Sequence, residues 1–187
     1  MFGLPRWKPG FQFTQPSSGR HESKVPRSMW MDEVRRGYAS DRLKPEASTA
    51  RELRDAVCRS LGLDPSKTKN VLFYSTLGTP LDLHEGIDGL MEVEIPPQAG
   101  VHAPPSRSTI TLDVATHAKI GQVLKADLLV VIPDYGIATG RQASAAIYGD
   151  HIAEKLRAGM TATEMQRLGI VIPEPKKPTG TRRISRQ

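Results

Sequence analysis

The sequence LMEVEIPPQAGVHAPPSRSTITLDV, residues 90–114, contains the most informative secondary-structure pattern of the chain. Apolar residues alternate with acidic residues over 90–95 and with mainly polar residues over 108–114. A period of two is typical of β-strands that have one apolar face. The residues between them, 96–105, contain four prolines, which favour a loop. The stretch therefore predicts an antiparallel hairpin with a long turn.

Helices and strands are also predicted on both sides of this hairpin. Leu53, Val57 and Leu61 recur at four-residue spacing, which predicts the apolar face of a helix. The continuous apolar run over 126–132 predicts a central strand covered on both faces. The order of the segments predicts an α/β fold with a mixed central sheet flanked by helices. The remaining predicted segments are a strand over 71–75, a short polar helix over 116–125, and helices over 48–62, 141–158 and 161–168.

The net positive charge of this 187-residue chain is confined to its two ends. Residues 1–47 and residues 171–187 each carry a net charge of +4, whereas residues 48–170 carry −2, which gives the overall +6. We therefore predict an extended, disordered basic arm over 1–47, an α/β core domain over 48–170 and a basic C-terminal tail over 171–187. Basic tails gain affinity for polyanions through counterion release, although such charges also serve simply to keep a tail soluble.

The N-terminal arm also carries aromatic residues, among them Trp7, Phe11 and Trp30. Aromatic side chains bury large areas, so we expect them to dock either on a partner or back onto the core. The stretch MWMDEVRRGY, residues 29–38, allows a short helix within the arm. A tail that binds only through its charge would not need these aromatic residues.

Several classes of protein are excluded by composition. Cys58 is the only cysteine, so no intramolecular disulfide and no zinc site built on paired cysteines can form. Cys58 is instead expected to be a small buried residue in a helix. No apolar run is long enough to span a membrane, and prolines interrupt the N-terminus where a signal peptide needs an apolar run. We predict a cytoplasmic protein.

Two aspartates fall where the paired strands of the hairpin bring them together. Asp88 lies in Gly-Ile-Asp-Gly just before the first strand, and Asp113 lies within the second. Two carboxylates are a common means of binding Mg²⁺, which polarises a phosphodiester and lowers the pKa of an attacking water. The simpler interpretations are that Asp88 is a turn residue and that Asp113 lies on a solvated strand face.

The layout of residues 50–132 resembles the PD-(D/E)XK nuclease superfamily. The shared features are a helix, a strand, a Gly-x-Asp motif, a second strand, a turn, a third strand that carries an acid, a further helix and an apolar strand. The resemblance implies a restriction-endonuclease-like fold, Mg²⁺ as cofactor and hydrolysis of DNA. It also implies that Asp88 and Asp113 are catalytic metal ligands and that Glu52, from the first helix, is a third acidic ligand.

The chain departs from this pattern at the lysine, since the expected position falls on Ala115. In the superfamily a lysine from the following helix can replace it, and Lys119 or Lys125 fits that position. We expect Lys119 to be catalytic; without such a lysine, the fold would be kept and the activity lost. The residues predicted to contact nucleic acid are Lys125, Arg141, Arg182 and Arg183.

Two other functions are also compatible with the sequence. One is a non-enzymatic assembly or structural protein whose aromatic, basic arm wraps a partner subunit or nucleic acid. The other is a small nucleotide-binding protein that uses the loop 136–141, because N–H groups at a helix start can hold phosphate. That loop matches neither the P-loop nor the dinucleotide-binding spacing. Glu92 and Glu94 share one face of their strand, which predicts a solvated strand edge.

Overall fold

The computed structural model describes residues 25–37, 48–115, 124–131 and 138–172. The strands in these ranges are β1 (Val71–Ser75), β2 (Gly89–Ile95), β3 (Ser106–Ala115) and β4 (Leu128–Val131). The helices are α1 (Arg27–Gly37), α2 (Ser48–Ser60), α3 (Pro80–Glu85), α4 (Ala138–Ala158) and α5 (Ala162–Leu168). No described helix is long and apolar enough to cross a membrane.

The four strands form one mixed sheet in the order β1-β2-β3-β4. β2 pairs antiparallel with both β1 and β3, whereas β4 runs parallel to β3. The predicted α/β fold with a mixed sheet is confirmed, and so is the β2–β3 hairpin with its long exposed turn. The apolar run that ends in β4 was expected to form a central strand, and this prediction is wrong. Among the described strands, β4 lies at the edge of the sheet. The prediction failed because an apolar run in the sequence does not specify the order of the strands.

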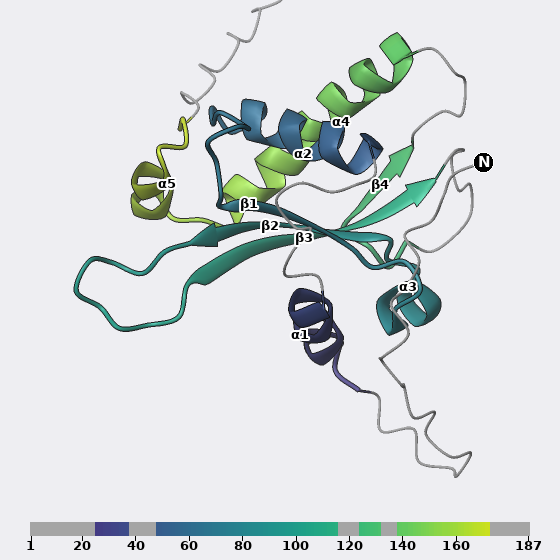
Figure 1. Ribbon diagram of the computed structural model, residues 1–187, viewed down its shortest axis with the longest axis horizontal. Helices are drawn as coiled ribbons and strands as arrows, with labels where there is room; N and C mark the ends of the chain where they lie inside the picture. The colour runs from purple at the N-terminus through teal and green to yellow at the C-terminus, as the bar shows by residue number, and fades with distance from the viewer. Residues whose placement is uncertain (1–24, 38–47, 116–123, 132–137, 173–187) are drawn as a thin grey trace, which may run out of the picture.

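The register of β2 and β3 sorts their side chains onto two faces, and different helices cover these two faces (Figure 1). One face carries Met91 and Val93 of β2 with Ile110 and Leu112 of β3, all buried in the larger apolar cluster. α2 and α4 cover this face, and α5 packs at its margin. The other face is covered by α1 and α3. A slip of one residue would turn these apolar side chains to the wrong face.

α2 and α4 contribute the helical half of the larger cluster. The predicted stripe of α2 is confirmed, since Leu53, Val57 and Leu61 are all buried there. Cys58 is also buried, as expected, and burial raises the pKa of its thiol to about 11. The thiol therefore stays protonated at neutral pH.

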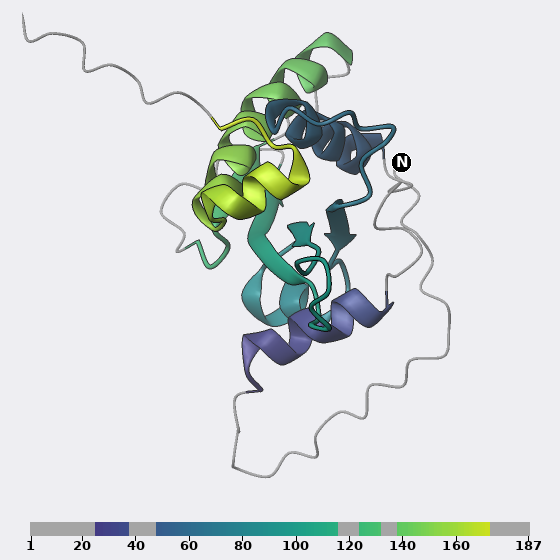
Figure 2. The ribbon, with the colours of Figure 1, turned by 90° about the vertical axis from the view of Figure 1, so that its left-hand side faces the viewer.

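The smaller apolar cluster joins the opposite face of the sheet to α1 and α3 (Figure 2). Leu72 and Tyr74 of β1 and Leu90 of β2 meet Leu81 of α3 and Val34 of α1. α1 belongs to the stretch 1–47 that was expected to be an extended arm. Within it the residues of α1 are helical, close to the short helix that the sequence allowed.

Other parts of the predicted tails and loops lie outside the described residues. These parts are 1–24, 38–47, most of the predicted polar helix over 116–125, and 173–187. Trp30 is described, and its ring stacks on His84 of α3 with ring centroids 5.6 Å apart. This aromatic of the arm thus rests on the core of its own chain.

α2 and α4 approach each other closely at Gly149. A Cβ added at Gly149 would lie 2.7 Å from the Cβ of Ala56 and 3.0 Å from its carbonyl carbon. We predict that Gly149→Ala destabilises the protein by about 1–3 kcal/mol, because the added methyl group would lie too close to Ala56. This loss should exceed the gain from the higher helix propensity of alanine. Urea unfolding measures this change. Adding Ala56→Gly should recover part of the loss, and a Gly149→Ala variant as stable as the wild type would contradict this packing.

Candidate functional site

Asp88 and Asp113 occupy neighbouring positions on the two central strands. Gly89 of β2 pairs with Leu112 of β3. Asp88 directly precedes Gly89, and its N–H donates to the carbonyl of the same Leu112 at 2.8 Å, so Asp88 lies beside the Leu112–Asp113 segment of β3. The structure therefore brings together the two carboxylates that the sequence singled out.

Hydrogen bonds fix Asp88 against β3. Its backbone N–H donates to the carbonyl of Leu112 at 2.8 Å, and its Oδ2 accepts from the backbone N–H of Val114 at 2.7 Å. These two residues flank Asp113 in the chain, so the carboxylate of Asp88 is held beside it. From β1, the N–H of Thr76 donates to the carbonyl of Asp88 at 3.0 Å. Asp88 is thus more than a turn residue, because it joins three segments of the sheet.

The pKa of Asp88 is raised above its ordinary value. Burial is the largest cause, and it outweighs the hydrogen bond from the Val114 N–H, which lowers the pKa. The negative charges of Asp113 and Asp82 raise the pKa further, as does a hydrogen bond with the Asp113 side chain. Crowded carboxylates disfavour their own ionisation, and a bound cation reverses that effect.

Asp113 lies on the face of β3 that carries polar side chains. It is only 6 % exposed, so it does not lie on a solvated face. Thr111, two residues earlier on the same face, accepts a hydrogen bond from Arg27 of α1 at 2.7 Å. The N–H and the hydroxyl of Thr111 both donate to Oδ2 of Asp127, at 2.8 and 2.7 Å. The segment of β3 that bears Asp113 is therefore anchored to α1 and to the residue preceding β4.

Of the other predicted site residues, the structure describes the side chains of Glu52 and Lys125. Glu52 belongs to α2, which covers the face of the sheet opposite to Asp113. Lys125 donates from Nζ to the carbonyl of His84 at 2.7 Å and lies 3.6 Å from Glu85, so its ammonium is engaged by the end of α3. Three predicted residues lie outside the described ranges, namely Lys119, Arg182 and Arg183. Arg141 lies in α4, in a part whose side chains the structure does not describe.

The donor set of the pair suits a hard divalent cation. Within the described ranges, no three His, Cys, Asp or Glu side chains gather as a metal-binding group. Mg²⁺ does not need such a cage, because it is commonly bound by one or two carboxylates with waters and substrate phosphates completing the shell. Asp88 and Asp113 provide that minimum from two adjacent strands. Their chemistry therefore fits the predicted Mg²⁺.

Asp82 and Thr76 also shape the site, and the sequence did not predict either of them. Thr76 lies in the turn that follows β1, and Asp82 lies in the first turn of α3. The hydroxyl of Thr79 donates to the carbonyl of Thr76 at 2.6 Å, and Pro80 begins α3. A proline directly after a threonine is typical of a helix start, and that signal could have identified α3.

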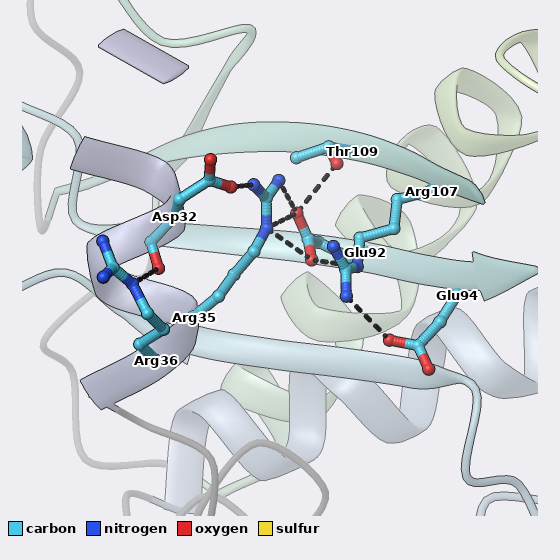
Figure 3. A network of polar contacts seen from close by, with 7 residues as sticks. All are labelled: Asp32, Arg35, Arg36, Glu92, Glu94, Arg107 and Thr109. Carbon is cyan, nitrogen blue, oxygen red and sulfur yellow. Dashed lines mark hydrogen bonds and ion pairs between the residues drawn. The ribbon is translucent and has the colours of Figure 1, made fainter. Parts of the chain in front are cut away.

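Glu92 was expected at a solvated strand edge, and this prediction is wrong. Its side chain is 0 % exposed and binds Arg35 of α1 and Thr109 of β3 (Figure 3). The alternation of acidic and apolar residues located Glu92 on the correct face of β2. It could not show that α1 covers this face, since α1 is far away in the sequence.

Comparisons of the chain with protein-family models, with curated proteins and with solved structures found no match. The resemblance to the PD-(D/E)XK superfamily therefore stays a prediction.

The raised pKa of Asp88 predicts a pH-dependent effect of Asp88→Asn on stability. In the folded protein this carboxyl keeps its proton to a higher pH than in the unfolded chain. Its contribution to the free energy of unfolding is therefore favourable at low pH and is lost as pH rises through the folded pKa. Asparagine cannot ionise and can still accept from the Val114 N–H. We expect Asp88→Asn to raise the melting temperature relative to the wild type at neutral pH.

The gain should shrink as pH falls below the ordinary aspartate range, where the wild-type carboxyl is protonated in both states. Calorimetry across this range, with a chelator present to exclude metal, measures the difference. A gain of equal size at all pH values would contradict the crowding of the two carboxylates.

Proposed function

We propose that residues 48–170 form a metal-dependent nuclease domain of the PD-(D/E)XK type that hydrolyses phosphodiester bonds in DNA. The observation that carries this proposal is the contact between Asp88 and Asp113 at the start of β2 and within β3. Each residue alone has an ordinary structural explanation. Two carboxylates that are held together, with the pKa of one of them raised, are more typical of a functional site than of a structural one.

The order of elements gives a second line of support. From α2 onward, the chain runs through β1, β2, β3 and β4 in the order on which the sequence resemblance was based, with α3 added between β1 and β2. The acid of the third strand lies in β3, and the Gly-x-Asp motif directly precedes β2. The finer assignment to a restriction-endonuclease-like fold is part of this proposal.

Asp88 and Asp113 would together bind Mg²⁺. The ion would act as a Lewis acid and lower the pKa of the attacking water. The Val114 N–H orients Asp88 through one oxygen, so that carboxylate needs little rearrangement to bind a ligand. Lys119 would stabilise the negative charge that develops on the phosphate. The basic residues at 182 and 183 would add affinity for the DNA backbone without reading its sequence.

Metal-dependent cleavage of DNA tests the proposal. We expect the full chain to cut double- or single-stranded DNA with Mg²⁺ or Mn²⁺, and chelation to abolish cutting. Asp113→Asn should lower the rate by more than about 100-fold, because loss of a direct ligand should exceed the effect of removing an outer-shell partner.

Asp150→Asn is a matched control. Asp150 lies in α4 and accepts a hydrogen bond from Ser60, which asparagine can also accept. This variant should cleave as well as the wild type. If the folded wild-type chain cuts neither DNA form with either metal, or if Asp113→Asn cuts equally well, the proposal is wrong.

A further inference from the structure

Glu92 is a fully buried carboxylate whose main partner comes from α1. The Nε of Arg35 donates to Oε1 at 3.0 Å and to Oε2 at 3.2 Å, and its Nη2 donates to Oε1 at 2.5 Å (Figure 3). The hydroxyl of Thr109 adds a bond at 2.8 Å. Burial disfavours the charge on Arg35, but the hydrogen bond and the charge of Glu92 outweigh it and raise the pKa of Arg35. The guanidinium of Arg35 therefore keeps its positive charge where it meets Glu92.

A second arginine lies beside the same carboxylate. The Nε of Arg107 in β3 is 3.8 Å from Oε2 of Glu92, and its Nη2 donates to Glu94 at 3.3 Å (Figure 3). The side chains of Arg107 and Glu94 are 34 % and 29 % exposed, so this arginine has room to move. Glu92 thus has one arginine from α1 and one from its neighbouring strand.

The rest of the α1 interface is small. Val34 is the only residue of α1 that is fully buried, and Trp30 and Met31 pack partly against the sheet. Arg27 adds its bonds to Thr111 and, at 3.4 Å, to the carbonyl of Lys125. An eleven-residue helix is marginally stable on its own in water, so α1 depends on these contacts to stay folded.

We propose that α1 is a displaceable strap across the sheet, fastened by Arg35 and released when Arg107 takes over Glu92. In the fastened state Arg35 binds Glu92, and Arg107 pairs with both Glu92, at 3.8 Å, and Glu94, at 3.3 Å. In the released state Arg107 closes on Glu92, and water reaches the carboxylate from the side that α1 leaves. Glu92 is paired in both states.

This exchange of partners explains why release can be a local event. Removing one partner from a buried ion pair is ordinarily strongly destabilising, because it leaves an unpaired buried charge. Here Arg107 and Thr109 remain with Glu92 when α1 departs. Segments with few buried apolar contacts open below the free energy of global unfolding, and α1 has one fully buried side chain.

Release of α1 would uncover the polar face of β3. Arg27 binds Thr111, and Asp113 lies two residues further along the same face. The strap therefore controls access to a face that includes one of the two candidate metal ligands. The proposal does not depend on nuclease activity, because it concerns the docking of α1 alone.

Hydrogen exchange of the full chain, followed by mass spectrometry, tests the strap. In Arg35→Ala, amides of α1 should exchange about tenfold faster or more, as expected for loss of a charge-assisted hydrogen bond. Amides of α2 should keep the wild-type rate. The matched control is Arg36→Ala, since Arg36 is exposed and its one hydrogen bond among the described residues goes to the Asp32 carbonyl within α1. This variant should leave α1 protected.

A second variant tests the exchange of partners. Arg35→Ala combined with Arg107→Ala leaves Glu92 without either arginine, so protection should fall in α2 and β2 as well as in α1. The proposal is overturned if Arg35→Ala deprotects α1 and α2 together, since α1 would then be an integral part of the core. It is also overturned if Arg35→Ala leaves α1 protected, or if the double variant opens no more than the single one.

Discussion

The antiparallel pairing of β2 with β3 is the constraint on which the rest of this structure depends. It places Gly89 opposite Leu112, and from that one register both faces of the sheet follow. One face is apolar and is covered by α2 and α4, which form most of the larger core. Just before β2, the N–H of Asp88 donates to the carbonyl of Leu112, and Asp88 lies close enough to Asp113 for the charge of Asp113 to raise its pKa. A displacement of one residue would bury the acids in the apolar core and separate the pair, so folding and the candidate site share a single determinant.

The second face of the sheet is unusual because polar side chains occupy much of its buried area. Glu92, Thr111 and Asp113 are all buried on it. Arg35 of α1 binds Glu92, and Arg27 of α1 binds Thr111. Burying such groups is unfavourable unless partners are supplied, which explains why a helix that contributes little apolar surface packs there. α1 thus covers this face of the sheet, although the charge and proline content of residues 1–47 suggested a separate arm.

The sequence predicted the elements of the fold well where the pattern was local. The hairpin, the stripe of α2 and the helix of α4 all follow from periodicity within one segment. It failed where the outcome depended on distant contacts. β4 is as apolar as a central strand but lies at an edge, and Glu92 alternates like a solvated residue but is covered by α1. The Asp88–Asp113 contact could be predicted because it needs only the hairpin register. The remaining predicted ligand, Glu52, depends on how α2 packs, and the structure places it across the sheet.

We propose that the pairing of β2 with β3 brings together two carboxylates that bind a divalent metal. Titration of the full chain with Mn²⁺, followed by electron paramagnetic resonance of the free ion, tests this directly and does not require cleavage. We expect a binding site in the wild type that is weakened strongly by Asp88→Asn and by Asp113→Asn, and that is retained in Asp150→Asn. Equal Mn²⁺ binding by all four proteins, or none by the wild type, would contradict it.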